Sequence, residues 1–146
     1  MMNQRGRPPK RLVKGQGIVM VVDDEPIMRK IASNVLEKSG YEVIVAENGD
    51  QAIELFKQHH NEIRAVLLDL LMPQKSGKET YLEMKQIQPD VNVILITGAI
   101  KDKRIDEVLE LGVKGYLEKP YTYPQLSRAV FNLIGKSKPD TSSRKK

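Results

Sequence analysis

The chain has 146 residues, about the length of one domain. Hydrophobic residues make up 40% and charged residues 29%, as in ordinary soluble proteins, and the absence of cysteine excludes disulfides and thiolate chemistry. The net charge of +5 comes from the ends, because residues 1–16 carry +5 and residues 136–146 carry +4, which leaves −4 for residues 17–135. Overall charge is therefore no indication that the folded part binds nucleic acid.

The two ends also differ from the middle in composition. Residues 1–16 are basic, contain "RGRPPK" and are predicted to form a flexible arm, and residues 136–146 are predicted to form a basic disordered tail. No apolar run approaches the roughly 18 residues of a membrane helix, and the N-terminus lacks the apolar segment of a signal peptide. We therefore expect a cytoplasmic protein with no membrane partner.

The "RGRPPK" segment resembles an AT-hook, an arm that lies in the narrow minor groove of A·T-rich DNA. A solubilising linker explains the same residues more simply, because a match of four residues in a basic segment is not specific. Nucleic acid is thus not the expected partner, and a DNA-associated regulator is kept as an alternative.

Short apolar runs begin between these ends. They are "IVMVV" (18–22), "YEVIVA" (41–46), "RAVLLDL" (64–70), "VNVILIT" (91–97) and "VKGYLEK" (113–119). The first, third and fourth runs are nearly continuous, which is typical of strands buried on both faces of a parallel sheet.

Helical periodicity fills the gaps between the runs. Ile27, Ile31 and Val35 recur every four residues in the first helix, and Gly40 marks its end. The later helices are indicated by Ala52, Ile53 and Phe56, by Tyr81 and Met84, by Ile105, Val108 and Leu109, and by Leu126, Ala129, Val130 and Leu133. This (βα)5 alternation predicts an α/β three-layer sandwich with right-handed crossovers.

Polar groups follow the strands at the edge where open α/β sheets bind ligands. Four strand ends carry them: "DDEP" (23–26), Asp69, Thr97 and Lys119-Pro120. Three carboxylates gathered there would repel one another, and a hard divalent cation removes the conflict. Oxygen ligands without His or Cys suit Mg²⁺.

The same set of groups favours phosphoryl transfer, in which the protein mostly positions groups and neutralises charge. A carboxylate can itself be the nucleophile and form an aspartyl-phosphate. Asp69 is the best candidate because apolar neighbours hold it firmly, and Asp23 and Asp24 are then the metal-binding acids.

Over about residues 17–135 the chain resembles a response-regulator receiver domain of two-component signalling. The resemblance is carried by "VVDDEP", "LLDLLMPQKSG", "ILITG" and "GYLEKP", in that order. It implies a flavodoxin-like sheet in the order 2-1-3-4-5. It also implies that Asp69 accepts phosphate from a histidine kinase or phosphotransfer protein, with Mg²⁺ held by Asp23, Asp24, Asp69 and the backbone carbonyl of Leu71.

The resemblance further implies a switch. Thr97 and Lys119 would contact the phosphoryl oxygens, and the bond between Lys119 and Pro120 would be cis. Tyr116 matches an aromatic switch position, whose ring turns into the space that Thr97 leaves. The face made by the fourth helix, fifth strand and fifth helix would then change shape for a downstream protein target.

Three alternatives compete with this interpretation. A nucleotide-binding α/β domain needs a Gly-rich turn after the first strand, where this chain has "DDEP". An aspartate-nucleophile phosphatase has Asp-x-Asp there, whereas here the doublet is adjacent. An inert, non-phosphorylated interaction module is expected to have lost an acid or the lysine, and all are present.

We expect no separate enzymatic activity, only the domain's own phosphorylation and slow dephosphorylation. The chain would be a stand-alone receiver or the C-terminal receiver of a hybrid histidine kinase. The segments "VKGQGIVMVVDDEP" and "GYLEKPYTYPQLSRAV" resemble that second context.

Overall fold

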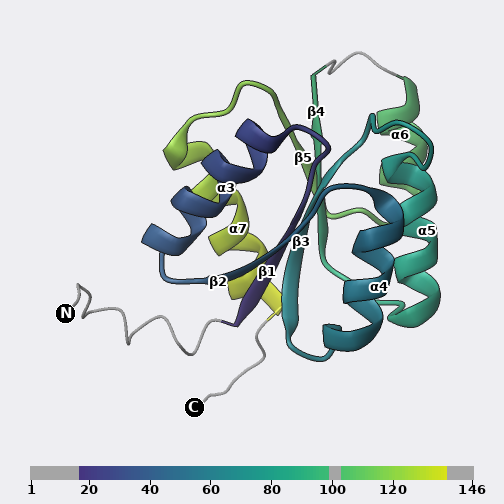
Figure 1. The fold of residues 1–146 in the computed structure, drawn as a ribbon, viewed down its shortest axis with the longest axis horizontal. Coiled ribbons are helices and arrows are strands. Elements are labelled where there is room, and N and C mark those ends of the chain that lie inside the picture. The colour runs from purple at the N-terminus through teal and green to yellow at the C-terminus, as the bar shows by residue number, and fades with distance from the viewer. Residues whose placement is uncertain (1–16, 99–102, 138–146) are drawn as a thin grey trace.

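The structure is a computed structural model that describes residues 17–98 and 103–137 (Figure 1). Its strands are β1 (Ile18–Val22), β2 (Glu42–Ala46), β3 (Ile63–Asp69), β4 (Val93–Thr97) and β5 (Gly115–Glu118). Its helices are α3 (Pro26–Lys38), α4 (Gly49–His59), α5 (Gly77–Ile87), α6 (Lys103–Glu110) and α7 (Tyr123–Ser137). The predicted arm and residues 138–146 of the predicted tail lie outside the described residues.

The strands form one parallel sheet in the order β2-β1-β3-β4-β5. This order and the alternation of strands with helices confirm the predicted flavodoxin-like fold. The bounds differ slightly from the predicted ones: β4 starts at Val93 rather than residue 91, and α7 reaches Ser137, two residues into the predicted tail. Hydrogen bonding to neighbours sets these ends, and apolar character alone does not encode it.

The continuous apolar runs are explained by two cores, one on each face of the sheet. In β1, Val19 and Val21 belong to the core beneath α3 and α7, while Met20 and Val22 belong to the core beneath α4, α5 and α6. Figure 1 shows these two helical layers on opposite sides of the strands. Because successive strand residues point to opposite faces, a strand covered on both sides has to be apolar throughout.

The inward face of α3 differs from the stripe that the four-residue spacing suggested. Its buried residues are Ala32, Val35 and Leu36. Ile27 is 68% exposed and Ile31 is 43% exposed. A spacing of four drifts around a helix, which has 3.6 residues per turn, so Ile27 lies off the face on which Val35 is buried.

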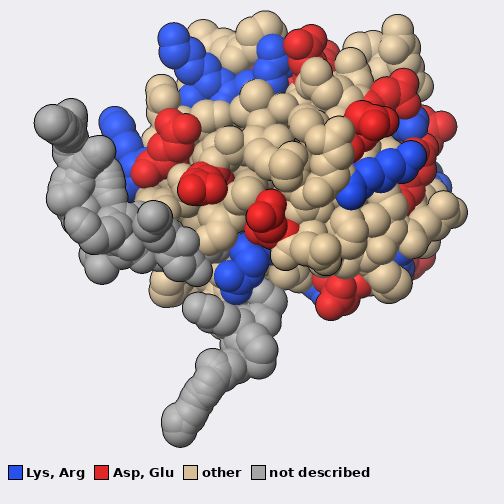
Figure 2. Space-filling model, turned by 60° about the horizontal axis from the view of Figure 1, so that its bottom comes forward, with Lys and Arg blue, Asp and Glu red and all other residues tan. Residues whose placement is uncertain are grey.

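Charged side chains of both signs are interspersed on the surface seen in Figure 2. None of the helices in residues 17–98 and 103–137 combines the length and apolar character that a membrane span requires.

Candidate functional site

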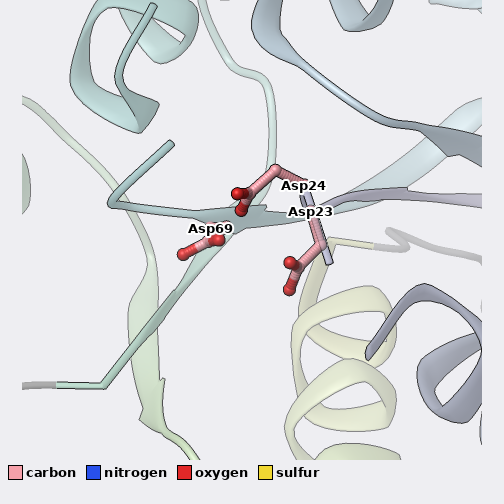
Figure 3. A group of neighbouring side chains, drawn as sticks. All are labelled: Asp23, Asp24 and Asp69. Carbon is pink, nitrogen blue, oxygen red and sulfur yellow. The ribbon is translucent and has the colours of Figure 1, made fainter. Parts of the chain in front are cut away.

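The pairing of β1 with β3 brings the first-strand acids to the third-strand acid. Val22 is the partner of Leu68 in the parallel ladder, so the next residues, Asp23 and Asp69, come side by side. Carboxylate oxygens of Asp23, Asp24 and Asp69 lie within 4.8 Å of one another. Figure 3 shows the three side chains gathered at the ends of the two strands.

The acidic turn after β1 is held by hydrogen bonds around Asp23. Its backbone N–H donates to the carbonyl of Ala46 at 3.1 Å, which ties the turn to the end of β2. The N–H of Glu25 donates to Asp23 Oδ1 at 2.9 Å, and Arg29 Nη1 donates to the Asp23 carbonyl at 2.8 Å. Asp23 is buried as a result of this packing, whereas Asp24 is half-buried.

Asp69 is only 4% exposed, and the loop that follows it folds back closely. The N–H of Leu71 donates to Asp69 Oδ1 at 3.3 Å, and the N–H of Gly77 donates to the carbonyl of Leu70 at 2.9 Å. A Cβ on Gly77 would lie 2.5 Å from the Asp69 carbonyl oxygen, so only glycine allows this approach. The side chain of Leu71 is exposed, while its backbone adjoins the carboxylate.

Lys119 brings an ammonium group into the acidic cluster. Its Nζ lies 3.0 Å from Glu25 Oε1, 3.3 Å from Asp23 Oδ2 and 3.5 Å from Asp69 Oδ2. The peptide bond between Lys119 and Pro120 is cis. The backbone N–H of Lys119 also donates to the carbonyl of Thr97 at 2.7 Å, which links the end of β5 to the end of β4.

The ionisation of these groups reflects burial and mutual charge. Burial, then the charge of Asp23, raises the pKa of Asp69 to about 7, although Lys119 opposes the change. Burial would lower the pKa of Lys119, but the hydrogen bond to Glu25 and the charges of Asp69 and Asp23 raise it. Burial, followed by the charge of Asp23, raises the pKa of Tyr121 to about 12. Lys119 therefore stays charged, and the Asp69 carboxyl is partly protonated near neutral pH.

Thr97 and Tyr116, the two residues of the predicted switch, lie in β4 and β5. Thr97 is fully buried at the end of β4, beside the strand that ends in Asp69. Tyr116 is paired across the ladder with Leu95, which points to the same face of the sheet as Thr97. Tyr116 is 42% exposed, and residues of β5 and α7, Tyr116 among them, line a groove of about 480 Å³.

The carboxylate set fits a hard divalent cation. Asp23 and Asp69 are buried next to each other, and one ammonium group cannot neutralise them together with Asp24. A cation bound by one oxygen of each carboxylate would relieve the repulsion that raises the pKa of Asp69. Oxygen donors of this kind suit Mg²⁺, with water completing its coordination.

Two residues at the site were not predicted from the sequence. Glu25 forms the shortest ion pair of Lys119, and Arg29 holds the Asp23 carbonyl. Glu25 directly follows the acidic doublet, which was a usable signal. Arg29 gave none, because a basic residue one turn into an exposed helix is commonly a surface residue.

Comparison with known proteins gives the family. Residues 19–131 match the response regulator receiver domain. The chemotaxis protein CheY of Bacillus subtilis is 30% identical over 113 residues, which cover 77% of this chain and 92% of CheY. The chain therefore belongs to the response regulator receiver domain family, the receivers of two-component signal transduction.

Solved structures agree with this assignment. A response regulator receiver domain protein from Clostridium thermocellum has a TM-score of 0.79 and 31% identity, covering 83% of this chain and 96% of that one. The receiver domain of the sensor histidine kinase PA1611 from Pseudomonas aeruginosa has a TM-score of 0.75 and 24% identity, covering 82% and 98%. That second structure has a magnesium ion coordinated in its active-site cleft and shares the fold with this chain.

Proposed function

We propose that this chain is a phosphoacceptor receiver in which Asp69 takes a phosphoryl group from a phosphohistidine. The donor is a histidine kinase or a phosphotransfer protein. The observation that carries the proposal is the gathering of three carboxylates within 4.8 Å, with an ammonium group 3.5 Å from Asp69. A CheY relative that aligns over most of its length supports the same conclusion.

The transfer is a displacement at phosphorus. A carboxylate oxygen of Asp69 forms the new O–P bond while the N–P bond to the donor's imidazole breaks, and the imidazole nitrogen keeps the electron pair. Asp23, Asp24, Asp69 and the carbonyl of Leu71 would hold Mg²⁺, which neutralises charge on the phosphoryl oxygens when it is bound. The magnesium in the PA1611 receiver supports this choice of ion.

Two further groups bind the transferred phosphoryl oxygens in this scheme. The Lys119 ammonium exchanges its pairing with Glu25 and Asp69 for a phosphoryl oxygen, and the Thr97 hydroxyl donates to another. Thr97 ends β4 and Lys119 directly follows β5, so both lie at the same edge of the sheet as Asp69. Positive charge and donors set in place before the reaction stabilise charge that builds up on the oxygens.

Output is proposed to pass through the face of α6, β5 and α7. Movement of Thr97 towards the phosphoryl group changes the space into which the exposed side chain of Tyr116 can pack. The ring then moves inward, and the face presents a different surface to a protein target.

A donor protein would approach over α3. Ile27 follows Pro26 and Glu25, so its exposed side chain lies close to the acidic site. Ile31, one turn further on, extends the same apolar surface. Exposed apolar residues beside charged ones are typical of surfaces that bind proteins.

The test is labelling of the chain by acetyl phosphate with Mg²⁺, read as the mass of the intact protein. We expect one added phosphoryl group on the wild-type chain and none on Asp69→Asn, because the amide cannot act as the nucleophile. Asp90→Asn is the matched control, since Asp90 is an exposed aspartate in the turn before β4. A label that survives in Asp69→Asn, or a wild-type chain that neither acetyl phosphate nor a kinase labels, would overturn the proposal.

A further inference from the structure

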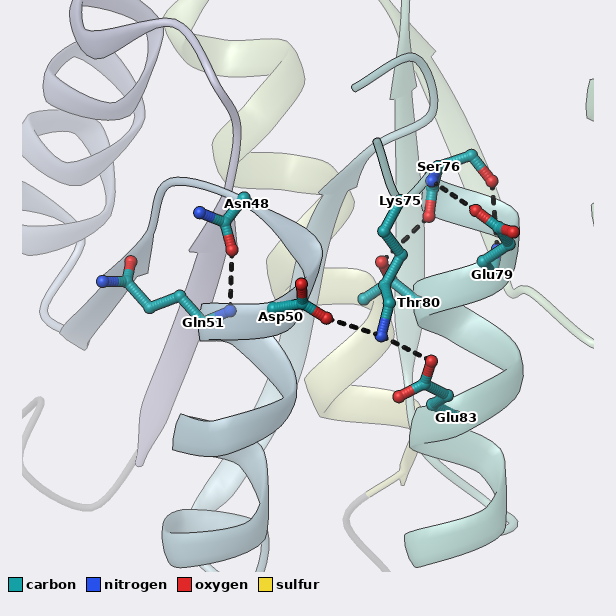
Figure 4. Close-up of polar contacts among 8 residues, drawn as sticks. All are labelled: Asn48, Asp50, Gln51, Lys75, Ser76, Glu79, Thr80 and Glu83. Atoms are coloured by element: carbon teal, nitrogen blue, oxygen red, sulfur yellow. Dashed lines mark hydrogen bonds and ion pairs between the residues drawn. The ribbon is translucent and has the colours of Figure 1, made fainter. Parts of the chain in front are cut away.

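The loop between β3 and α5, residues 70–76, is held by a lysine that has no part in the site described above. Lys75 Nζ lies 2.9 Å from Asp50 Oδ1 in the first turn of α4 and pairs with Glu83 on α5. Figure 4 shows Lys75 between the two helices, with a carboxylate on each side. One side chain thus joins the loop to both of its helical neighbours.

The stem of Lys75 is packed as well as paired. Its side chain is 22% exposed, which is low for a lysine in a surface loop. A Cβ on Gly49 would lie 2.7 Å from Lys75 Cδ and 2.3 Å from Thr80 Oγ1, so α4 begins in close contact with the loop. Thr80 Oγ1 in turn donates to the carbonyl of Ser76 at 2.9 Å, and Thr80 is fully buried.

The backbone on either side of Lys75 is also constrained. The Lys75 N–H donates to the carbonyl of Pro73 at 2.8 Å, and Gln74 between them has a φ of 69°. Ser76 starts α5 with a capping box in which Ser76 and Glu79 each accept the other's backbone N–H. Lys75 is therefore the last residue before a fixed helix start and lies four residues after Leu71.

We infer that Lys75 is a positioning residue for the metal site. Its two ion pairs hold the 70–76 loop against α4 and α5, so that the carbonyl of Leu71 keeps the position in which it completes the Mg²⁺ ligands. This inference rests on the proposed function, because it takes the loop to supply a ligand to the cation.

The direction in which Mg²⁺ affinity changes when Lys75 is neutralised distinguishes a positioning role from an effect of charge alone. Replacing Lys75 by a neutral residue makes the surroundings of the acidic cluster more negative. By charge alone this would strengthen the binding of a cation. Loss of positioning weakens it instead, as happens when residues that orient metal ligands are removed.

The experiment is a Mg²⁺ titration of the full chain followed by ¹H–¹⁵N NMR chemical shifts. We expect Lys75→Met to bind Mg²⁺ about 3- to 10-fold more weakly than wild type, the range that one or two partly exposed ion pairs supply. Lys75→Arg keeps the charge and length, so its affinity is expected within about twofold of wild type. Lys78→Met is the matched control, since Lys78 lies on α5 and pairs at 3.2 Å with Glu107 Oε1 of α6, so its ion pair does not join the loop to α4.

Each outcome gives a decision. If wild type binds no Mg²⁺, the proposed function fails. If wild type binds it and Lys75→Met binds equally or more tightly, the positioning role is overturned while the proposed function stands. Should Lys75→Met lose its dispersed spectrum, Asp50→Asn and Glu83→Gln replace it: both are expected to bind more weakly than Asp90→Asn, and equal affinity in all three overturns the inference.

Discussion

Asp69 ionises in surroundings that disfavour its charge. It is almost fully buried, Asp23 lies beside it, and its pKa is raised to about 7. A proton and a divalent cation therefore compete for the same carboxylate near neutral pH. A cation that binds there has to displace a proton from a fraction of the molecules, so its affinity should rise with pH.

The same pKa has a consequence for stability. An unfolded aspartate has a pKa near 3.8, so between about pH 4 and pH 7 the folded chain binds more protons at Asp69 than the unfolded chain does. This carboxyl therefore makes the free energy of unfolding fall as pH rises through that window, and the loss is complete above it. Three pKa units correspond to about 4 kcal/mol at most.

Asp69→Asn removes this dependence. Without added metal, the melting temperature of Asp69→Asn minus that of wild type is expected to be small near pH 4, to increase up to about pH 7 and then to level off. Thermal unfolding by circular dichroism at several pH values measures it. A flat difference for Asp69→Asn would contradict the raised pKa.

At the level of the elements, α4 and α5 meet through Gly49 with no room for a side chain. Gly49→Ala would put a methyl group against Thr80 Oγ1, which cannot move freely because it donates to Ser76. We expect the variant to be less stable by about 1–3 kcal/mol through overpacking. Gly135→Ala is the control: nothing lies within 4 Å of its added Cβ, and alanine favours a helix, so stability should rise by up to about 1 kcal/mol. Urea unfolding distinguishes the two, and an unchanged Gly49→Ala would show that the contact yields easily.

Most elements were predictable from the sequence because their cause is local. The runs in β1, β3 and β4 are apolar at every position, since both faces of the sheet are covered. The inward face of α3 could not be predicted in this way. The sequence indicated a stripe through Ile27 and Val35, whereas the residues buried against the sheet lie on a neighbouring stripe. Which stripe is buried depends on how the helix lies across the strands, and that is a property of the assembled fold.

On the scale of the whole molecule, the charge is divided between the ends and the middle. The basic residues 1–16 include no group of the proposed site, whose members lie between residues 23 and 119. Deleting residues 1–16 is therefore expected to leave labelling by acetyl phosphate unchanged.

We also expect the full chain's retention on duplex DNA to be independent of A·T content. Salt-dependent retention on A·T-rich duplex that vanishes after the deletion would instead support the AT-hook alternative.

The site was predictable to the extent that its groups stand at strand ends. The apolar runs located those ends, and the parallel order brought Asp23, Asp24 and Asp69 to one edge. Lys75 could not be recognised in this way, because one of its partners lies 25 residues earlier and acts from another helix. From the sequence alone, a lysine in a loop is predicted to be a solvated surface residue, because the helices around it are not known.

β5 is an edge strand of the sheet, and this position distinguishes the Lys119 ammonium from the three acids. β5 has four residues and a single neighbour, whereas β1 and β3, which carry the acids, each have a neighbour on both sides. Segments with few neighbours open at lower free energy than strands in the core. Brief fraying of this edge strand would withdraw the ammonium while the three acids stayed assembled, and in the proposed mechanism a phosphoryl group on Asp69 would then be held less firmly.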